Sequence, residues 1–287
     1  MGRDVDIWHH RRVLIFSIPS VFLMKVLSRH TSELDELGYT LLPSWAPAEL
    51  LAELRATVSR LYEIEGEKAG SEFRMEPGCL RLANLVDKGA VFERVIAAPE
   101  LLGLVEHVIG PDYKLSSLNG RTALPGCLPQ PLHADMGGVT DERGNWVCNI
   151  IWMLDAYTPD NGPLRVVPGS HRWRRLPQTD LADLRASHPA EKLVTAPAGS
   201  VVVMNAHLWH GGVDNRTQGH RTALHAFYCR RDKPQQQYQK QLIRPEVQAT
   251  FSNEIRHLLA LDDPRNDELA QSTMARSGFL PDRPRAF

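Results

Sequence analysis

Residues 200–229, SVVVMNAHLWHGGVDNRTQGHRTALHAFYC, contain two short apolar runs joined by a polar connection. The runs SVVVMNA and TALHAFYC are rich in β-branched and aromatic residues, and Gly, Asn and Asp fill the connection, which is typical of two strands and a turn region. His210 follows the first run and Arg221 opens the second. Gly211 and Gly212 let the backbone pass close to a bound ligand. The stretch therefore predicts two β-strands whose ends carry candidate functional side chains.

Similar short runs recur from residue 112 onward, separated by Gly, Pro and Asn clusters: YKLSSLN (113–119), WVCNIIWML (146–154), LRVVP (164–168) and EKLVTAP (191–197). Helical spacing precedes them over 44–61, with Pro47 in the first turn, and over 99–109, between Pro99 and Gly110. Residues 33–43 predict a helix end and a short strand, and residues 246–261 predict a return to helix. Helices followed by many short strands indicate a mainly β sandwich or barrel with helical support.

A histidine and a carboxylate lie two residues apart in PLHADMGG, residues 131–138. In a strand, residues i and i+2 face the same side, so His133 and Asp135 can both project into the mouth of a barrel and chelate a metal. The alternative is a solvated turn that runs into Gly137-Gly138. The pair alone leaves both interpretations open.

An iron site of this kind needs a third ligand from another strand. The downstream candidates are six histidines, His171, His188, His207, His210, His220 and His225. His210 is favoured because it follows an apolar run, whereas His207 and His220 lie in turn or flanking positions. Two histidines and one carboxylate leave three iron positions for 2-oxoglutarate and dioxygen, and Arg221 would neutralise the far carboxylate of 2-oxoglutarate. Arg221 could equally be an ordinary surface strand arginine.

The composition excludes some classes of protein. The formal net charge is −1, with 43% hydrophobic and 23% charged residues, which argues against a nucleic-acid surface. The four cysteines, Cys79, Cys127, Cys148 and Cys229, are scattered without paired spacing. This predicts neither a zinc ribbon nor a disulfide framework, and reduced thiols indicate a cytoplasmic protein.

The most apolar segment, VLIFSIPSVFLMKVL (13–27), follows Arg11-Arg12. It is shorter than the ~18–20 residues that span a bilayer, so we expect no stable membrane insertion. It resembles a signal peptide but lacks a small-x-small cleavage site. We favour translation from Met24, with residues 1–23 as an extension and residues 24–287 as a single domain.

Three motifs together, PLHADMGG, NGPLRVVPGSH (161–171) and HGGVDNRTQGHR (210–221), resemble the phytanoyl-CoA dioxygenase family of Fe(II)/2-oxoglutarate oxygenases, over residues 33–236. The resemblance implies a double-stranded β-helix, a jelly-roll or cupin-like core, with N- and C-terminal helices. It implies Fe(II), 2-oxoglutarate and O2, with ascorbate as a stimulant. His133, Asp135 and His210 fall on the iron ligands, and Arg221 falls on the residue that holds the distal carboxylate.

The resemblance implies further contacts. Trp152 falls on an aromatic residue of the co-substrate site, and Asn119, Ser116 and Arg81 lie at or near co-substrate positions. Many members carry a serine where this chain has Gly212, so we expect Thr217 to supply a hydroxyl instead. Strand position alone gives the substrate-pocket candidates, which are Arg121, Met136, Trp146, Trp209 and Arg230.

We therefore expect an oxygenase that hydroxylates a C–H bond of a small molecule and converts 2-oxoglutarate to succinate and CO2. Two alternatives stay open, a non-catalytic ligand-binding barrel and a zinc-dependent hydrolase with the same His/Asp/His site. The hydrolase leaves Arg221 without a role. Halogenation is disfavoured because Asp135 occupies the position that halide would need. The sequence does not identify the substrate, and the oligomeric state is open between monomer and dimer.

Overall fold

The core of the protein is a pair of antiparallel sheets. The computed structural model describes residues 20–273. The main sheet has six strands in the order β1 (Tyr39–Leu42), β7 (Val201–Asn205), β4 (Val147–Met153), β9 (Arg221–Arg230), β3 (Tyr113–Ala123) and β2 (Cys79–Leu82). The second sheet has the order β6 (Lys192–Val194), β5 (Leu164–Val166) and β8 (His210–Gly212). All the paired strands are antiparallel, as expected for the predicted jelly-roll core.

The two faces of the main sheet have different partners. Strand side chains alternate between faces, and on β4 Cys148, Ile150 and Trp152 join the cluster formed with the helices. Ile151 and Met153 face the other way and pack with residues of the second sheet, including Leu164, Val166 and Val194. The space between the two sheets is therefore the barrel interior, and the helices cover the outside of the main sheet.

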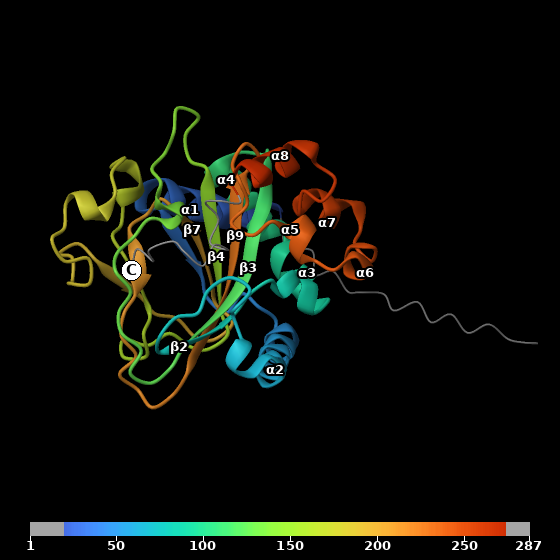
Figure 1. Cartoon of the computed structure of the whole chain (residues 1–287). Coiled ribbons are helices and arrows are strands. Elements are labelled where there is room, and N and C mark those ends of the chain that lie inside the picture. Colours follow the sequence, from blue (N-terminus) through green and yellow to red (C-terminus); the bar gives the residue numbers. More distant parts are fainter. Residues whose placement is uncertain (1–19, 274–287) are drawn as a thin grey trace, which may run out of the picture.

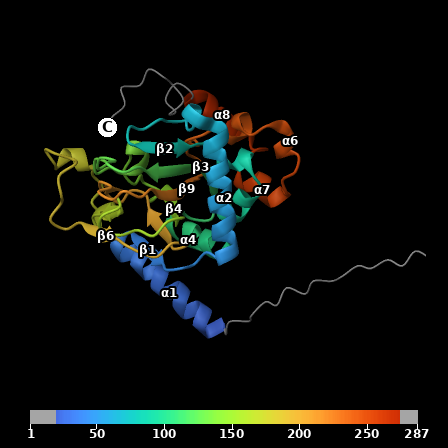
Figure 2. The same ribbon diagram turned by 90° about the horizontal axis from the view of Figure 1, so that it is seen from below.

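The main helices on that outer side are α2 (Ala48–Glu65), α3 (Val91–Ile96) and α4 (Pro99–Ile109). Figure 2 shows α2 running beside the strands of the main sheet. Pro99 occupies the first turn of α4 and Gly110 ends it with a φ of 81°, as the sequence predicts. The predicted helix over 44–61 begins instead at Ala48, because Pro47 is the residue that precedes its first turn. Five short 3-10 turns occur elsewhere in residues 20–273, at Gly66–Lys68, Leu85–Lys88, Asp135–Gly137, Ser170–Arg172 and Pro177–Thr179.

The two ends of the described chain are helical. Helix α1 (Ser20–Leu37) is one helix from Ser20, so the expected domain start at Met24 falls inside it, and residues 1–19 lie outside the described residues. The predicted helix over 246–261 is two short helices, α6 (Pro245–Gln248) and α7 (Asn253–Leu258), flanked by α5 (Gln239–Leu242) and α8 (Pro264–Thr273). Figure 1 shows these C-terminal helices grouped on one side of the sheet. Within residues 20–273, no helix is both long and apolar enough to cross a membrane.

Candidate metal centre

Three side chains converge at the mouth of the barrel. His133, Asp135 and His210 each offer one ligand atom, and these atoms lie within 4.8 Å of one another. The Asp135 carboxylate lies between the two imidazoles, with Oδ1 3.8 Å from Nε2 of His133 and Oδ2 3.7 Å from Nε2 of His210. Two imidazole nitrogens and one carboxylate form the donor set that open iron sites use.

The backbone that positions these residues differs from the expected pair of strands. His133 and His210 exchange reciprocal backbone hydrogen bonds of 2.9 Å, which join the segment before Asp135 to β8 as a single bridge. Asp135 then enters a tight turn in which Met136 has a φ of 58°. His210 opens β8 of the second sheet and does not simply trail the strand before it. The three residues are therefore arranged around β8 of the second sheet.

Hydrogen bonds fix the orientation of the three candidate ligands. The Nδ1 atoms of His133 and His210 lie 2.9 Å and 2.8 Å from the carbonyl oxygens of Pro131 and Leu208. A proton donated by Nδ1 leaves Nε2 unprotonated and free to bind a metal. Asn149 donates to Oδ2 of Asp135 over 3.3 Å. Burial, together with the neighbouring His210, lowers the pKa of His133 to about 4, so His133 is neutral at pH 7.

Arg221 lies on the same inner face of the barrel, at the start of β9. Its Nη1 donates to the Tyr157 hydroxyl over 2.8 Å, and its Nη2 donates to the Gly162 carbonyl over 2.5 Å. The guanidinium stands 4.5 Å from the centre of the Tyr157 ring. Burial lowers the pKa of Arg221, and its Nε has no acceptor among the described residues. Its partners are neutral, so its positive charge is uncompensated.

Two further arginines on this face share one carboxylate. Arg81 and Arg121 lie opposite each other on β2 and β3. Glu76 accepts from Arg121 over 2.8 Å and 3.1 Å and forms an ion pair with Arg81 at 3.3 Å. Burial alone would raise the pKa of Glu76, but the hydrogen bonds and charge of Arg121 outweigh burial and lower it to about 2. Arg121 is therefore an ion-paired side chain of the inner face.

The inner face also carries unpaired polar atoms close to the ligands. Asn119 on β3 lies opposite His225 on β9. Neither Oδ1 of Asn119 nor Nε2 of His225 has a hydrogen-bond partner among the described residues. Burial, followed by the charge of Arg81, holds the pKa of His225 well below its usual value. The sequence interpretation did not include Glu76 or Tyr157, and it considered His225 only as a candidate third ligand, although strand parity with Arg221 could have placed it on this face.

Several expected contacts lie away from this face. Trp152 points to the opposite side of β4, where its ring packs 5.2 Å from Trp45, so it does not line the co-substrate site. Ser116 is the extra residue of a bulge on β3, and its hydroxyl accepts from the backbone of Gln236. Thr217 donates to Oδ1 of its neighbour Asn215 over 2.7 Å within a surface loop, so it does not replace the missing serine.

Some of the substrate-pocket candidates lie near the metal centre and others do not. Trp209 is fully buried in a side cluster and donates to the carbonyl of Arg175, so it does not reach the pocket. Met136, which is 39% exposed, follows Asp135 directly and stays a candidate. Trp146 closes the same loop and packs 5.2 Å from the ring of His207. Arg230 is an anchor of that loop instead of a pocket residue.

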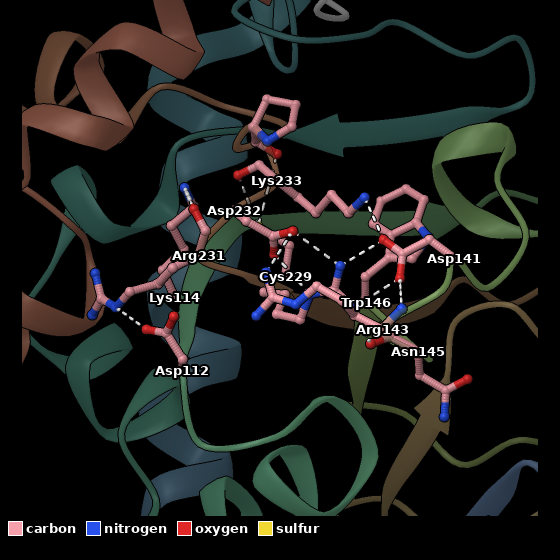
Figure 3. A network of polar contacts seen from close by, with 12 residues as sticks. Asp112, Lys114, Asp141, Arg143, Asn145, Trp146, Cys229, Arg231, Asp232 and Lys233 are labelled. Atoms are coloured by element: carbon pink, nitrogen blue, oxygen red, sulfur yellow. Dashed lines mark hydrogen bonds and ion pairs between the residues drawn. The ribbon is translucent and has the colours of Figure 1, made fainter.

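A network of charges holds the loop that follows Asp135 (Figure 3). Arg230 binds Asp141 through Nη1 at 3.1 Å and Nη2 at 2.5 Å, and it also binds Asp232 at 2.7 Å. Lys233 pairs with Asp141 at 2.6 Å and lies 5.2 Å from the centre of the Trp146 ring. The loop over residues 136–146 is therefore fixed to the end of β9, which restricts the backbone of the adjacent ligand.

A jelly-roll barrel with a His/Asp/His centre at its mouth defines a class, the non-haem iron oxygenases. Residues 34–223 match the family model described as phytanoyl-CoA dioxygenase (PhyH). The chain belongs to this family of Fe(II)/2-oxoglutarate-dependent dioxygenases, which confirms the resemblance in its motifs.

Individual proteins of known sequence or structure are also similar to this chain. The protein "Dioxygenase af480" of Aspergillus fumigatus is 30% identical over 246 residues, covering 80% of this chain and 75% of the relative. L-Proline trans-4-hydroxylase of Streptomyces griseoviridis is 28% identical over 198 residues, covering 58% of this chain and 71% of the relative. The structure of EctD from S. alaskensis with bound Fe has a TM-score of 0.61 at 21% identity, covering 72% of this chain and 78% of that chain. The epimerase SnoN from nogalamycin biosynthesis, with a TM-score of 0.60 at 20% identity over 72% of this chain and 84% of that chain, shares the fold.

Proposed function

We propose that this protein hydroxylates a C–H bond of a small molecule, with 2-oxoglutarate converted to succinate and CO2. The observation that carries the proposal is the charge state of the barrel interior. Of the buried arginines that the structure describes, Arg121, Arg165, Arg230 and Arg231 each pair with a carboxylate. Arg221 alone has neutral partners. Buried charges are rarely left unpaired, so this position calls for an anionic ligand.

The three proposed ligands fit Fe(II) by their chemistry. His133 and His210 present unprotonated Nε2 atoms because carbonyl oxygens occupy their Nδ1 atoms. Asp135 supplies the negative charge, and Asn149 restrains its carboxylate. Iron held by these residues would supply oxygen activation and leave positions for the co-substrate.

Arg221 fits the distal carboxylate of 2-oxoglutarate. Its contacts with Tyr157 and Gly162 hold the guanidinium in one orientation, so little conformational freedom is lost when an anion binds. A side chain at position 212 would meet Oε1 of Gln130 at 3.2 Å and Nη1 of Arg121 at 3.5 Å, so these two residues fill the space of the absent serine. We therefore assign most of the anchoring to Arg221.

The alternatives lack a corresponding observation. A zinc hydrolase or a non-catalytic barrel with the same triad gives no reason for an uncompensated buried cation beside it. An intact carboxylate ligand supports hydroxylation over halogenation, and we propose a small molecule as the substrate. The cytoplasmic location and the single domain over 24–287 stay predictions.

The decisive test is anaerobic titration with Fe(II) and 2-oxoglutarate, monitored by visible absorbance. We expect a weak charge-transfer band that needs both components and is lost in Asp135→Ala. Asp183→Ala, which removes an exposed aspartate, is the matched control and should keep the band. In air, a metabolite screen should find a compound that stimulates succinate release and gains one oxygen. Binding of zinc with oxygen-independent hydrolysis would contradict the proposal.

A further inference from the structure

The fold brings together two cysteines that are far apart in the sequence. Cys79 is the first residue of β2, and Cys127 lies in the loop between β3 and the metal ligands. Their Sγ atoms are 2.9 Å apart, and both cysteines are free thiols. A disulfide bond is about 2.05 Å long, so closure needs a movement of about 0.9 Å. The spacing of the cysteines in the sequence gave no sign that these two thiols are neighbours.

The surroundings of the two sulfur atoms are unequal. Nη2 of Arg121 donates to Sγ of Cys127 over 3.5 Å. The hydrogen bond from Cys79, together with the charge of Arg121, lowers the pKa of Cys127, while the pKa of Cys79 is raised by the same hydrogen bond and by burial. The cation beside Cys127 therefore favours the thiolate form at Cys127 over the thiolate form at Cys79. This is the arrangement in which a thiolate reacts with an oxidant and a second thiol resolves the product.

The pair also lies close to the surface. Cys79 is 9% exposed and Cys127 is 1% exposed, but the residues that flank them, Gly78, Leu80, Gly126 and Leu128, are all exposed. Cys148 and Cys229 are fully buried and belong to clusters on opposite faces of the main sheet. Cys79 and Cys127 are therefore a neighbouring pair near the surface, and the fully buried Cys148 and Cys229 serve as controls within the same chain.

We propose that Cys79 and Cys127 are a modification site, at which hydrogen peroxide oxidises the two thiols to an intramolecular disulfide. The Cys127 thiolate attacks one peroxide oxygen, so an S–O bond forms, the O–O bond breaks, and the leaving oxygen takes a proton to become water. The Cys79 sulfur then attacks the sulfenic acid sulfur. The S–S bond forms, the S–O bond breaks, and the hydroxyl leaves as a second water with the proton of Cys79. Two thiols are oxidised by two electrons and one peroxide is reduced.

The bond would join two parts of the rim of the barrel. Glu76 and Arg81 flank Cys79 in the segment that enters and forms β2, and Gln130 and Pro131 follow Cys127 on the way to His133. The carbonyl oxygen of Pro131 lies within hydrogen-bond distance of the Nδ1 atom of His133. Oxidation would therefore cross-link the ion-paired inner face to the segment that carries a metal ligand. Constraining so long a loop restricts the unfolded chain and stabilises the protein.

The test uses the full chain, reduced and then treated with one equivalent of hydrogen peroxide in the presence of a chelator that removes iron. Of the four cysteines in the sequence, two should become unreactive to a thiol reagent after denaturation. The intact mass should fall by about 2 Da, and a non-reducing peptide map should join the peptides that contain residues 79 and 127. The melting temperature should rise by several degrees and return to its starting value with dithiothreitol.

Variants separate this pair from adventitious oxidation. Cys79→Ser and Cys127→Ser should each abolish the loss of two thiols, and Cys148→Ser should leave it intact. If a variant does not fold, the non-reducing peptide map of the wild-type protein still shows whether residues 79 and 127 are joined. Four remaining thiols, a cross-link that includes Cys148 or Cys229, or a link between two chains would each overturn the proposal.

Discussion

Replacing Arg221 by methionine removes the uncompensated positive charge of the barrel interior and keeps most of the side-chain volume. If Arg221 binds the distal carboxylate of 2-oxoglutarate, the variant leaves that anion buried without its partner. Such a loss costs about 3–5 kcal/mol, which is roughly a 150-fold to 5,000-fold loss of affinity. Arg221→Lys should recover only part of it, because an ammonium cannot hold both Tyr157 and Gly162 while it faces the anion. Tyr157→Phe removes one neutral hydrogen bond, about 0.5–1.5 kcal/mol, and should weaken binding by about tenfold at most.

Anaerobic calorimetry of the Fe(II)-loaded protein measures this affinity, and metal analysis measures iron content, which should not change. Stability gives an independent check. Because the cation has no carboxylate partner, Arg221→Met should not lower the midpoint of urea unfolding when 2-oxoglutarate is absent. Arg60→Met, at an exposed position of α2, is the matched control and should bind 2-oxoglutarate as the wild type does. Wild-type affinity in Arg221→Met, or a large loss of stability without the co-substrate, would refute the assignment.

Three other changes test separate parts of the structure. Glu76→Gln should lower the unfolding free energy at pH 7 by roughly 3 kcal/mol, because the folded pKa of Glu76, about 2, lies below its unfolded value of 4.5. The wild type should lose this stability as the pH falls from 4.5 to about 2, whereas the variant should not. Equal acid unfolding curves for the two proteins would contradict this. Arg230→Met should free the loop over residues 136–146, seen as faster proteolysis there and weaker metal binding; an unchanged digestion pattern would show that its ion pairs are dispensable. A chain that starts at Met24 should fold and keep its activity, although this start shortens α1; an insoluble product would show that residues 1–23 belong to the domain.

The sequence predicted the parts of the fold that carry a strong local pattern. The apolar runs became β3, β4, β5, β6, β7 and β9, because β-branched and aromatic residues fit a half-buried pleated surface. The strands β2 and β8 were missed for a physical reason. The sequences CLRL and HGG have little strand propensity, and their pairing comes from tertiary contacts with β3 and β5. The helix over 246–261 was predicted as one element because its apolar spacing hides the break at which Ser252 accepts a hydrogen bond from the backbone of Ile255.

In the candidate site, too, the residues with a local sequence signal could be predicted and the long-range contacts could not. His133, Asp135, His210 and Arg221 could be chosen because short motifs and family resemblance fix their positions. Trp152 was assigned to the wrong face, because β4 has apolar residues on both sides and alternation gives no direction there. Contacts between residues distant in the sequence had no local signal. Glu76 neutralises Arg121 across two strands, and Cys79 meets Cys127 through the turn that follows β3.

The reciprocal backbone bridge between His133 and His210 has a consequence for how the protein responds to metal supply. The two residues come from separate segments, and an ion held by both side chains spans the seam where those segments meet. An ion that binds only the closed seam stabilises it in proportion to the logarithm of ion concentration above the dissociation constant. Amide hydrogen exchange at His133 and His210 should therefore slow as iron is added, while the exchange of core amides in β4 changes less. Under iron starvation, the first part of the barrel to open would be the part that holds the chemistry, so the enzyme would lose its function before it lost its fold.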